Sequence, residues 1–113
     1  MNSDELQFEN SMVLTVVQAL IGAVTANIMA VSLSAKFSQS DLRVYYAVDW
    51  IDPRFDDLVE QIETDIEGLT AGAVRIQSEV WEGSTWATEA WEGRNQRFVF
   101  ARATASLWLD PNE

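Results

Sequence analysis

The chain contains neither cysteine nor histidine, and each absence removes a class of chemistry. Without cysteine, no disulfide, zinc–thiolate site or thiol nucleophile can form. Without histidine, there is no imidazole base, no serine–histidine pair and no histidine metal ligand. These absences fit a reducing compartment, so we expect a cytoplasmic protein that uses no metal and no cofactor.

Positive charge is scarce. Seven lysines and arginines face 18 aspartates and glutamates, which gives a net charge of −11. A field of this sign repels nucleic-acid phosphates and anionic membrane surfaces, and it attracts basic proteins. We therefore expect a basic protein partner and no direct contact with nucleic acid or membrane. The alternative is that the acids only keep the chain soluble.

One long stretch without charge, residues 10–35, raises the question of a membrane span. Polar residues interrupt it, and its apolar period changes from helical to alternating along the way. Acids precede it, and no lysine or arginine comes before Lys36, which is wrong for a signal peptide. The pattern predicts a helix followed by a strand instead.

Apolar residues form 48% of the chain, with only two prolines and five glycines, which predicts one packed domain over 1–113 with flexible ends at 1–5 and 105–113. The apolar periods predict an α+β domain in α-β-β-α-β-β order. We expect a mainly antiparallel four-stranded sheet with both helices on one face. The expected elements are a helix over 4–23, strands over 28–37 and 42–50, a helix from 53 to about 70, and strands over 74–81 and 97–103.

The second helix has the clearest start, because Asp52 is a favourable cap and Pro53 suits the first helical position. Apolar residues recur along one side of it at helical spacing, and acids fill most of the rest. After Arg54 the helix has no basic residue, and like-charged neighbours three or four apart cost about 0.2–0.5 kcal/mol per pair. This one-signed face predicts a surface for a cationic partner, with a merely solvated face as the alternative. Its acids are Asp56, Asp57, Glu60, Glu63, Asp65 and Glu67.

Tryptophan is the other unusual feature, since Trp81, Trp86 and Trp91 recur at intervals of five residues. Three acids accompany them, namely Glu82, Glu89 and Glu92. Tryptophan beside carboxylates is typical of an interface anchor. The rings could equally cover the open face of the sheet, and both interpretations stay open for this segment.

No motif for catalysis stands out. There is no glycine-rich phosphate loop, the acids of 52–57 lack the order of a calcium loop, and among 18 acids the proximity of some pair is uninformative. We therefore expect no catalytic residue and a protein that is not an enzyme. The residues expected to bind the partner are Asp56, Asp57, Glu60, Glu63, Glu67, Glu82, Trp86, Glu89, Trp91 and Glu92.

Three stretches carry a resemblance to a known group: the helix-to-strand run over 19–31, the strand over 44–49, and the acidic helix after Asp52 and Pro53. Together they resemble small acidic bacterial immunity proteins of contact-dependent growth inhibition and other polymorphic toxin systems. The likeness covers most of residues 12–103 by pattern, without a diagnostic motif, and it leaves out the tryptophan-rich segment 81–93. It implies a compact α+β domain that binds a toxin domain, often a basic nuclease, and covers its active or substrate-binding surface. It offers no catalytic residue to carry over.

These observations lead to one functional hypothesis and two alternatives. The hypothesis is an immunity protein that neutralises a cognate basic toxin domain by electrostatically steered binding. The first alternative is an acidic adaptor or assembly protein that binds another basic protein without inhibiting it. The second is a small hydrolase that depends on carboxylates.

Overall fold

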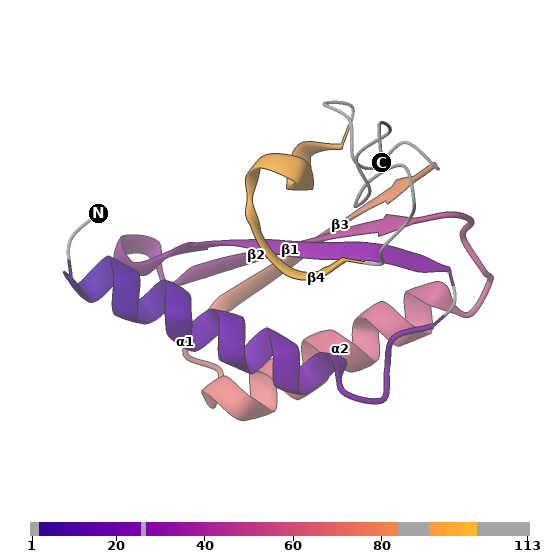
Figure 1. Ribbon diagram of the computed structural model, residues 1–113. Helices are drawn as coiled ribbons and strands as arrows, with labels where there is room; N and C mark the ends of the chain where they lie inside the picture. Colours follow the sequence, from indigo (N-terminus) through magenta and orange to yellow (C-terminus); the bar gives the residue numbers. More distant parts are fainter. Residues whose placement is uncertain (1–2, 26, 84–90, 102–113) are drawn as a thin grey trace, which may run out of the picture.

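The computed structural model describes residues 3–25, 27–83 and 91–101, and it shows a small α+β domain with two helices and a four-stranded sheet (Figure 1). The elements follow one another as expected, with a short 3-10 turn in each of two connections. Their bounds are α1 Ser3–Leu20, β1 Ile28–Lys36, η1 Phe37–Gln39, β2 Asp41–Val48, α2 Phe55–Thr70, β3 Arg75–Glu82, η2 Glu92–Asn95 and β4 Arg97–Ala101.

The sheet is mixed, which corrects the expectation of a mainly antiparallel one. Its strand order is β3-β2-β1-β4, and β1 runs antiparallel to both β2 and β4. Strand β3 instead runs parallel to β2, with Asp41 opposite Arg75 and Val48 opposite Glu82. The reason is that α2 connects β2 to β3 and carries the chain back to the end of the sheet where β2 begins, as parallel neighbours require.

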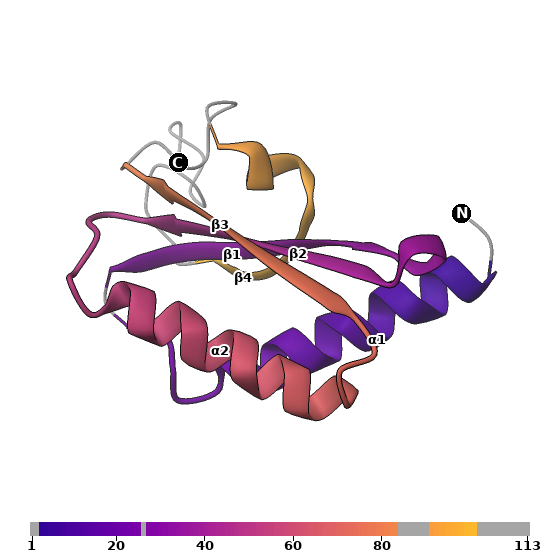
Figure 2. The same ribbon diagram turned by 180° about the vertical axis from the view of Figure 1, so that it is seen from behind.

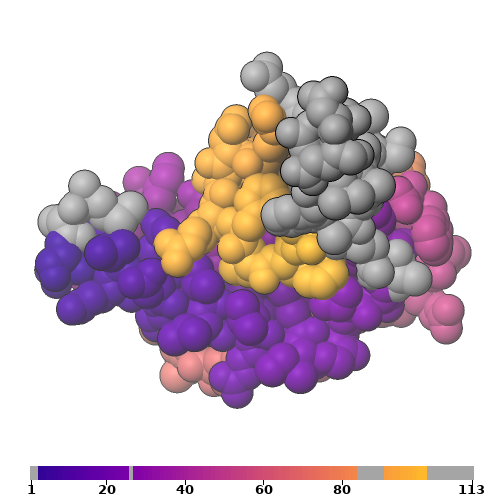
Figure 3. All heavy atoms as spheres, in the orientation of Figure 1, coloured from indigo at the N-terminus to yellow at the C-terminus, as the bar shows by residue number. Residues whose placement is uncertain are grey.

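Both helices lie on one face of the sheet (Figure 2), and the main core forms between the helices and that face. Helix α2 contributes Phe55, Ile62 and Ile66, which pack with buried residues of α1, β1 and β2. The opposite face has a second, smaller core around Trp91, beneath η2. Figure 3 shows η2 and β4, in orange and yellow, lying over the first half of the chain. The sheet is therefore covered on both sides near its centre.

The strand ends differ from the expectation by one or two residues, and both helices differ as well. Helix α1 covers 3–20 and not 4–23, so residues 3–5, expected to be flexible, are helical. Helix α2 begins at Phe55, so Pro53 is not its first residue. The Asp52 carboxylate instead accepts a 2.8 Å hydrogen bond from the Arg54 backbone N–H and closes a turn before the helix. The sequence signal therefore marked a turn into the helix and not its first residue. The expected flexible end 105–113 lies outside the described residues.

A stripe of exposed aliphatic side chains follows the outer side of α1. Its residues are Leu6, Leu14 and Val17 of the helix and Ile21 directly after it, and Leu14 and Ile21 are 70% and 77% exposed. None of the helices in the described part of the chain is both long and apolar enough to cross a membrane.

Tyr46 of β2 places a phenol in the main core, where its ring packs edge-on against Phe55 at 6.0 Å. Within the described residues its hydroxyl has no hydrogen-bond partner of normal geometry. Burial first, and then the nearby Glu63 carboxylate, raise the pKa of the Tyr46 phenol well above its usual range.

Gly93 of η2 provides a test of the smaller core. A Cβ on this residue would lie within 2.6 Å of the Ser32 hydroxyl oxygen and closer still to the Trp91 ring. We expect Gly93→Ala to lower the free energy of unfolding by about 1–3 kcal/mol, because overpacking forces the neighbours to move. Gly68→Ala is the control, since a Cβ on this residue of α2 would meet no neighbouring group within 4 Å. It should raise stability by up to about 1 kcal/mol through helix propensity. Urea unfolding measures both, and equal effects would contradict this packing.

Tyr46→Phe tests the buried phenol. Because the raised pKa favours the protonated form in the folded state, folding binds that proton more tightly than the unfolded chain does. The wild-type free energy of unfolding should therefore fall as pH rises above about 10, where the phenol of the unfolded chain ionises. Tyr46→Phe should lack this part of the loss, and at pH 7 it should cost no more than about 1 kcal/mol, because the hydroxyl that it removes has a contact with Ser78 but no hydrogen bond of normal geometry. Parallel alkaline profiles for the two proteins, measured by chemical unfolding, would count against this account.

Candidate functional site

Helix α2 presents a continuous line of carboxylates on one side. Asp56, Glu60, Glu63 and Glu67 are spaced by four, three and four residues, so they follow one side of the helix, and we call them the acidic stripe. Three of them are exposed and Glu63 is half-buried. The packing of Phe55, Ile62 and Ile66 into the core leaves no other direction for these side chains. The structure thus brings together four of the acids that the sequence placed on this helix.

Glu63 shows which way the stripe faces. Its carboxylate accepts a 2.7 Å hydrogen bond from the Ser78 hydroxyl of β3, which is an edge strand of the sheet. A shallow depression of about 220 Å³ lies beside it, lined by Glu63, Glu67, Gly72, Val74 and Ile76. The stripe therefore borders the β3 edge.

Four arginines of the described residues form ion pairs with acids outside the stripe. Arg43 lies 3.9 Å from Glu79, Arg54 3.5 Å from Asp52, Arg75 3.2 Å from Asp41 and Arg97 2.8 Å from Glu9. Across residues 3–25, 27–83 and 91–101, no lysine or arginine forms an ion pair with the acidic stripe. The negative charge of the stripe is uncompensated there.

The two remaining acids of α2 lie apart from the stripe. Asp57 is exposed and lines a pocket near the start of the helix. Asp65 is exposed, and its carboxylate accepts a 3.1 Å hydrogen bond from the Gln61 side-chain amide. Asp57, a predicted partner-binding residue, is thus next to the stripe in sequence but belongs to a different surface feature.

Trp91 does not form the exposed anchor that was one of the two interpretations of the tryptophan-rich segment. Trp91 is only 2% exposed, packs with Tyr45 and Ala47, and meets the Phe98 ring edge-on at 5.7 Å. It is a core residue, so its predicted contact with a partner is corrected. The physical reason is that the second face of the sheet carries apolar residues, and the large ring of Trp91, directly before η2, buries them. Trp81 is half-buried in the same cluster.

Glu82 and Glu92, the two described acids of this segment, do not join the stripe either. The Glu82 carboxylate accepts a 2.7 Å hydrogen bond from the Ile51 backbone N–H, so it braces the connection between β2 and α2. Glu92 is exposed in η2, on the face of the sheet opposite α2. Trp86 and Glu89 lie outside the described residues.

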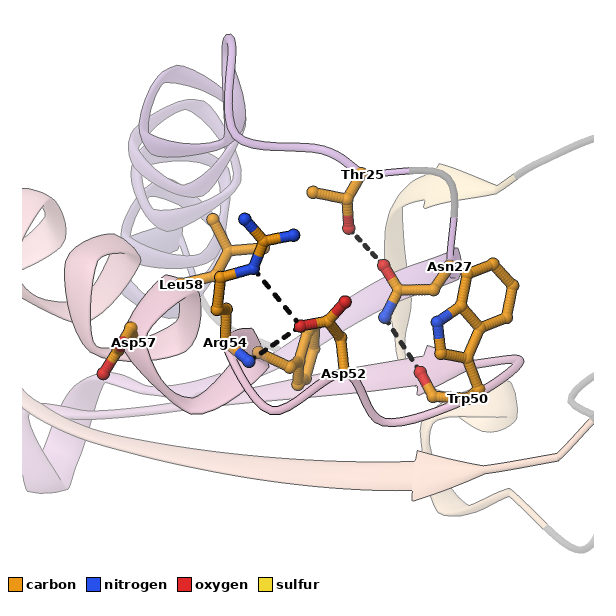
Figure 4. Close-up of a pocket in the computed structure, with 8 residues that line it drawn as sticks. Thr25, Asn27, Trp50, Asp52, Arg54, Asp57 and Leu58 are labelled. Atoms are coloured by element: carbon orange, nitrogen blue, oxygen red, sulfur yellow. Dashed lines mark hydrogen bonds and ion pairs between the residues drawn. The ribbon is translucent and has the colours of Figure 1, made fainter.

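A pocket of about 540 Å³ opens at the end of the sheet where α2 begins, and sequence reasoning missed it. It lies where the connections before β1 and after β2 meet the first turns of α2 (Figure 4). Trp50 is 50% exposed here, although its alternation with the strand residues had placed it on the sheet. We call this site the Trp50 pocket. Its lining residues are Thr25, Asn27, Trp50, Asp52, Arg54, Phe55, Asp57 and Leu58.

Asn27 holds the two connections of the Trp50 pocket together. It is buried, and its side-chain amide donates a 2.9 Å hydrogen bond to the Trp50 carbonyl oxygen. Its side-chain oxygen accepts a hydrogen bond from the Thr25 hydroxyl, and its backbone carbonyl accepts one from the Asp49 N–H at 2.9 Å. These contacts preform the pocket. From the sequence, this asparagine had indicated only the end of the first helix.

Among the described residues, no three side chains of the usual metal-binding types converge on one point. What the stripe and the pocket offer is binding: a line of carboxylates that no cation of the described chain pairs with, and a concave site beside it.

Compared with models of known protein families and with curated protein sequences, this chain matches none. The functional features reported above are therefore those of its own residues, with no relative's activity to carry over to them.

Proposed function

We propose that this chain is a cytoplasmic immunity protein, which binds a cognate basic toxin domain and neutralises it by covering the toxin's functional surface. One observation carries the proposal: within the described residues the acidic stripe has no ion pair, while four arginines of the same chain pair with other acids. A surface that is negative only for solubility can intersperse its acids with cations, and after Arg54 helix α2 contains none.

The stripe has a cost that a partner would relieve. Asp56–Glu60, Glu60–Glu63 and Glu63–Glu67 are like-charged pairs at helical spacing, each unfavourable by about 0.2–0.5 kcal/mol. Lysines or arginines of a docked protein would turn this repulsion into attraction. The net charge of −11 would also steer a basic partner toward the surface before contact.

A nuclease is the partner class that fits best, because it must carry basic side chains to hold nucleic-acid phosphates. Carboxylates on a rigid helix compete with phosphates for those same side chains. When the carboxylates occupy the basic side chains of the nuclease, its substrate cannot bind. The inhibitor carries out no reaction, so the proposed role is not enzymatic.

An adaptor that joins two proteins is the second candidate, and the exposed aliphatic stripe of α1 favours it. An adaptor needs two separate surfaces, and Leu14 and Ile21 belong to an apolar one that the acidic stripe does not use. The two candidates differ in what happens to the partner, because only immunity abolishes the partner's activity.

The charge on the stripe can be tested by reversal. We expect Glu60→Lys with Glu67→Lys to slow association with the basic partner at least tenfold at low salt and to flatten its salt dependence. Asp4→Lys with Glu92→Lys is the matched control, because both residues are exposed, both lie outside α2 and the Trp50 pocket, and the net charge changes equally. Stopped-flow mixing measures both variants, with the partner captured from native-cell extract and purified. Equal slowing by the two variants would place the effect in overall charge and not in the stripe.

Growth separates immunity from the adaptor role. The captured partner is expressed alone and then together with this chain. Immunity predicts that the partner alone arrests growth and that the chain restores it. Growth that is unaffected by the partner alone would contradict the proposed function.

A further inference from the structure

The Trp50 pocket combines an exposed aromatic ring with carboxylates, above an apolar floor. Trp50 forms one wall, and Phe55 and Leu58 lie among the lining residues near the start of α2. Asp52 and Asp57 bring two negative charges and Arg54 brings one positive charge, so the lining has a net negative charge. An aromatic face beside a carboxylate is a favourable setting for an organic cation.

Arg54 already occupies part of this setting with its own guanidinium. Its Nε lies 3.5 Å from the Asp52 Oδ1 atom, and Figure 4 shows the guanidinium and the carboxylate directed into the same space. The Arg54 side chain is 89% exposed, so this ion pair is a weak surface contact that another cation can replace. The Asp52 Oδ1 atom also accepts the Arg54 backbone N–H at 2.8 Å, which keeps the carboxylate in place when the guanidinium leaves.

We propose that the Trp50 pocket binds an arginine side chain of the basic partner, which displaces the guanidinium of Arg54. The arriving guanidinium stacks on the Trp50 ring and pairs with the Asp52 carboxylate, while its methylene stem covers the apolar floor. Arginine suits the site better than lysine, because its planar group both stacks on an aromatic face and bonds a carboxylate through two N–H groups.

This inference rests on the proposed function for the identity of the partner, and it adds an anchor to that binding surface. Burial of one aromatic–arginine contact in a pocket is typical of the residues that dominate binding energy at interfaces. Asp57 links the two features, because it lines the pocket and follows the first residue of the acidic stripe. The stripe attracts the partner and the pocket fixes its position.

The test uses a small probe, so it does not depend on finding the partner. N-acetyl-arginine methylamide is titrated into the full ¹⁵N-labelled chain, and the indole N–H signal of Trp50, assigned with Trp50→Phe, is followed by NMR. N-acetyl-citrulline methylamide is the matched probe, because it has nearly the same shape and no charge. We expect saturable shifts with the arginine probe and binding at least about tenfold weaker with the citrulline probe. Equal binding of the two probes, or no binding of either, overturns the proposal.

Two substitutions give opposite expectations. Asp52→Asn keeps the side-chain oxygen that accepts the Arg54 N–H and should weaken the arginine probe about tenfold. Arg54→Gln removes the internal competitor and should strengthen the same probe several-fold. Because Arg54 is exposed, its variant remains informative if Asp52→Asn fails to fold. Weaker binding by Arg54→Gln would overturn the displacement mechanism.

Glu60→Gln with Glu67→Gln separates this inference from the proposed function. These changes should leave probe binding within about twofold, because neither residue lines the pocket. If this variant loses probe binding while Asp52→Asn keeps it, the cation site lies on the stripe and the proposal is overturned. If the probe binds as expected but no partner protein is inhibited, the pocket assignment stands and the immunity proposal fails.

Discussion

The packing of α2 against the sheet determines which acidic side chains of this helix lie together on the surface. Phe55, Ile62 and Ile66 enter the core beside β2, and their burial sets the rotation of the helix about its axis. With that rotation set, the acids at the intervening positions must point to solvent or toward the β3 edge. The hydrogen bond from Ser78 to Glu63 fits this orientation. The geometry of the acidic stripe is thus a consequence of hydrophobic packing.

Positive charge is distributed unevenly over this domain, because the paired arginines lie away from the acidic stripe. Arg43 and Arg75 pair with acids across the β2–β3 strand pair, and Arg97 joins β4 to Glu9 of α1. These exposed pairs contribute little to stability individually. Their larger effect is to engage cations away from the acidic stripe, so that no cation of the described residues pairs with its carboxylates. A basic protein approaching by diffusion would meet that side first.

Much of the fold followed from residue patterns, and the exceptions have physical causes. Helical and alternating periods identified all six main elements, because burial of one face requires them. The parallel pairing of β3 was missed because an alternating pattern identifies a strand but not the strand beside which it lies. A strand–helix–strand order does favour parallel pairing of the two strands. Trp91 could not be assigned from its neighbours, since the need to cover the second sheet face appears only in three dimensions. The acids of α2 were found from sequence because they share one helix. The Trp50 pocket was not, because residues of two segments far apart in the sequence form it, 25–27 and 50–58.

The most direct measurement of the central claim is an amide chemical-shift map of the free chain titrated with a short oligoarginine peptide. The account predicts that the largest shifts fall on residues 56–67 and on the Trp50 indole, and that they fade as salt is raised. Shifts spread evenly over the surface, or greatest around Asp4 and Glu92, would contradict it. In that case the negative charge of this chain has no preferred side, and α2 is not a binding surface.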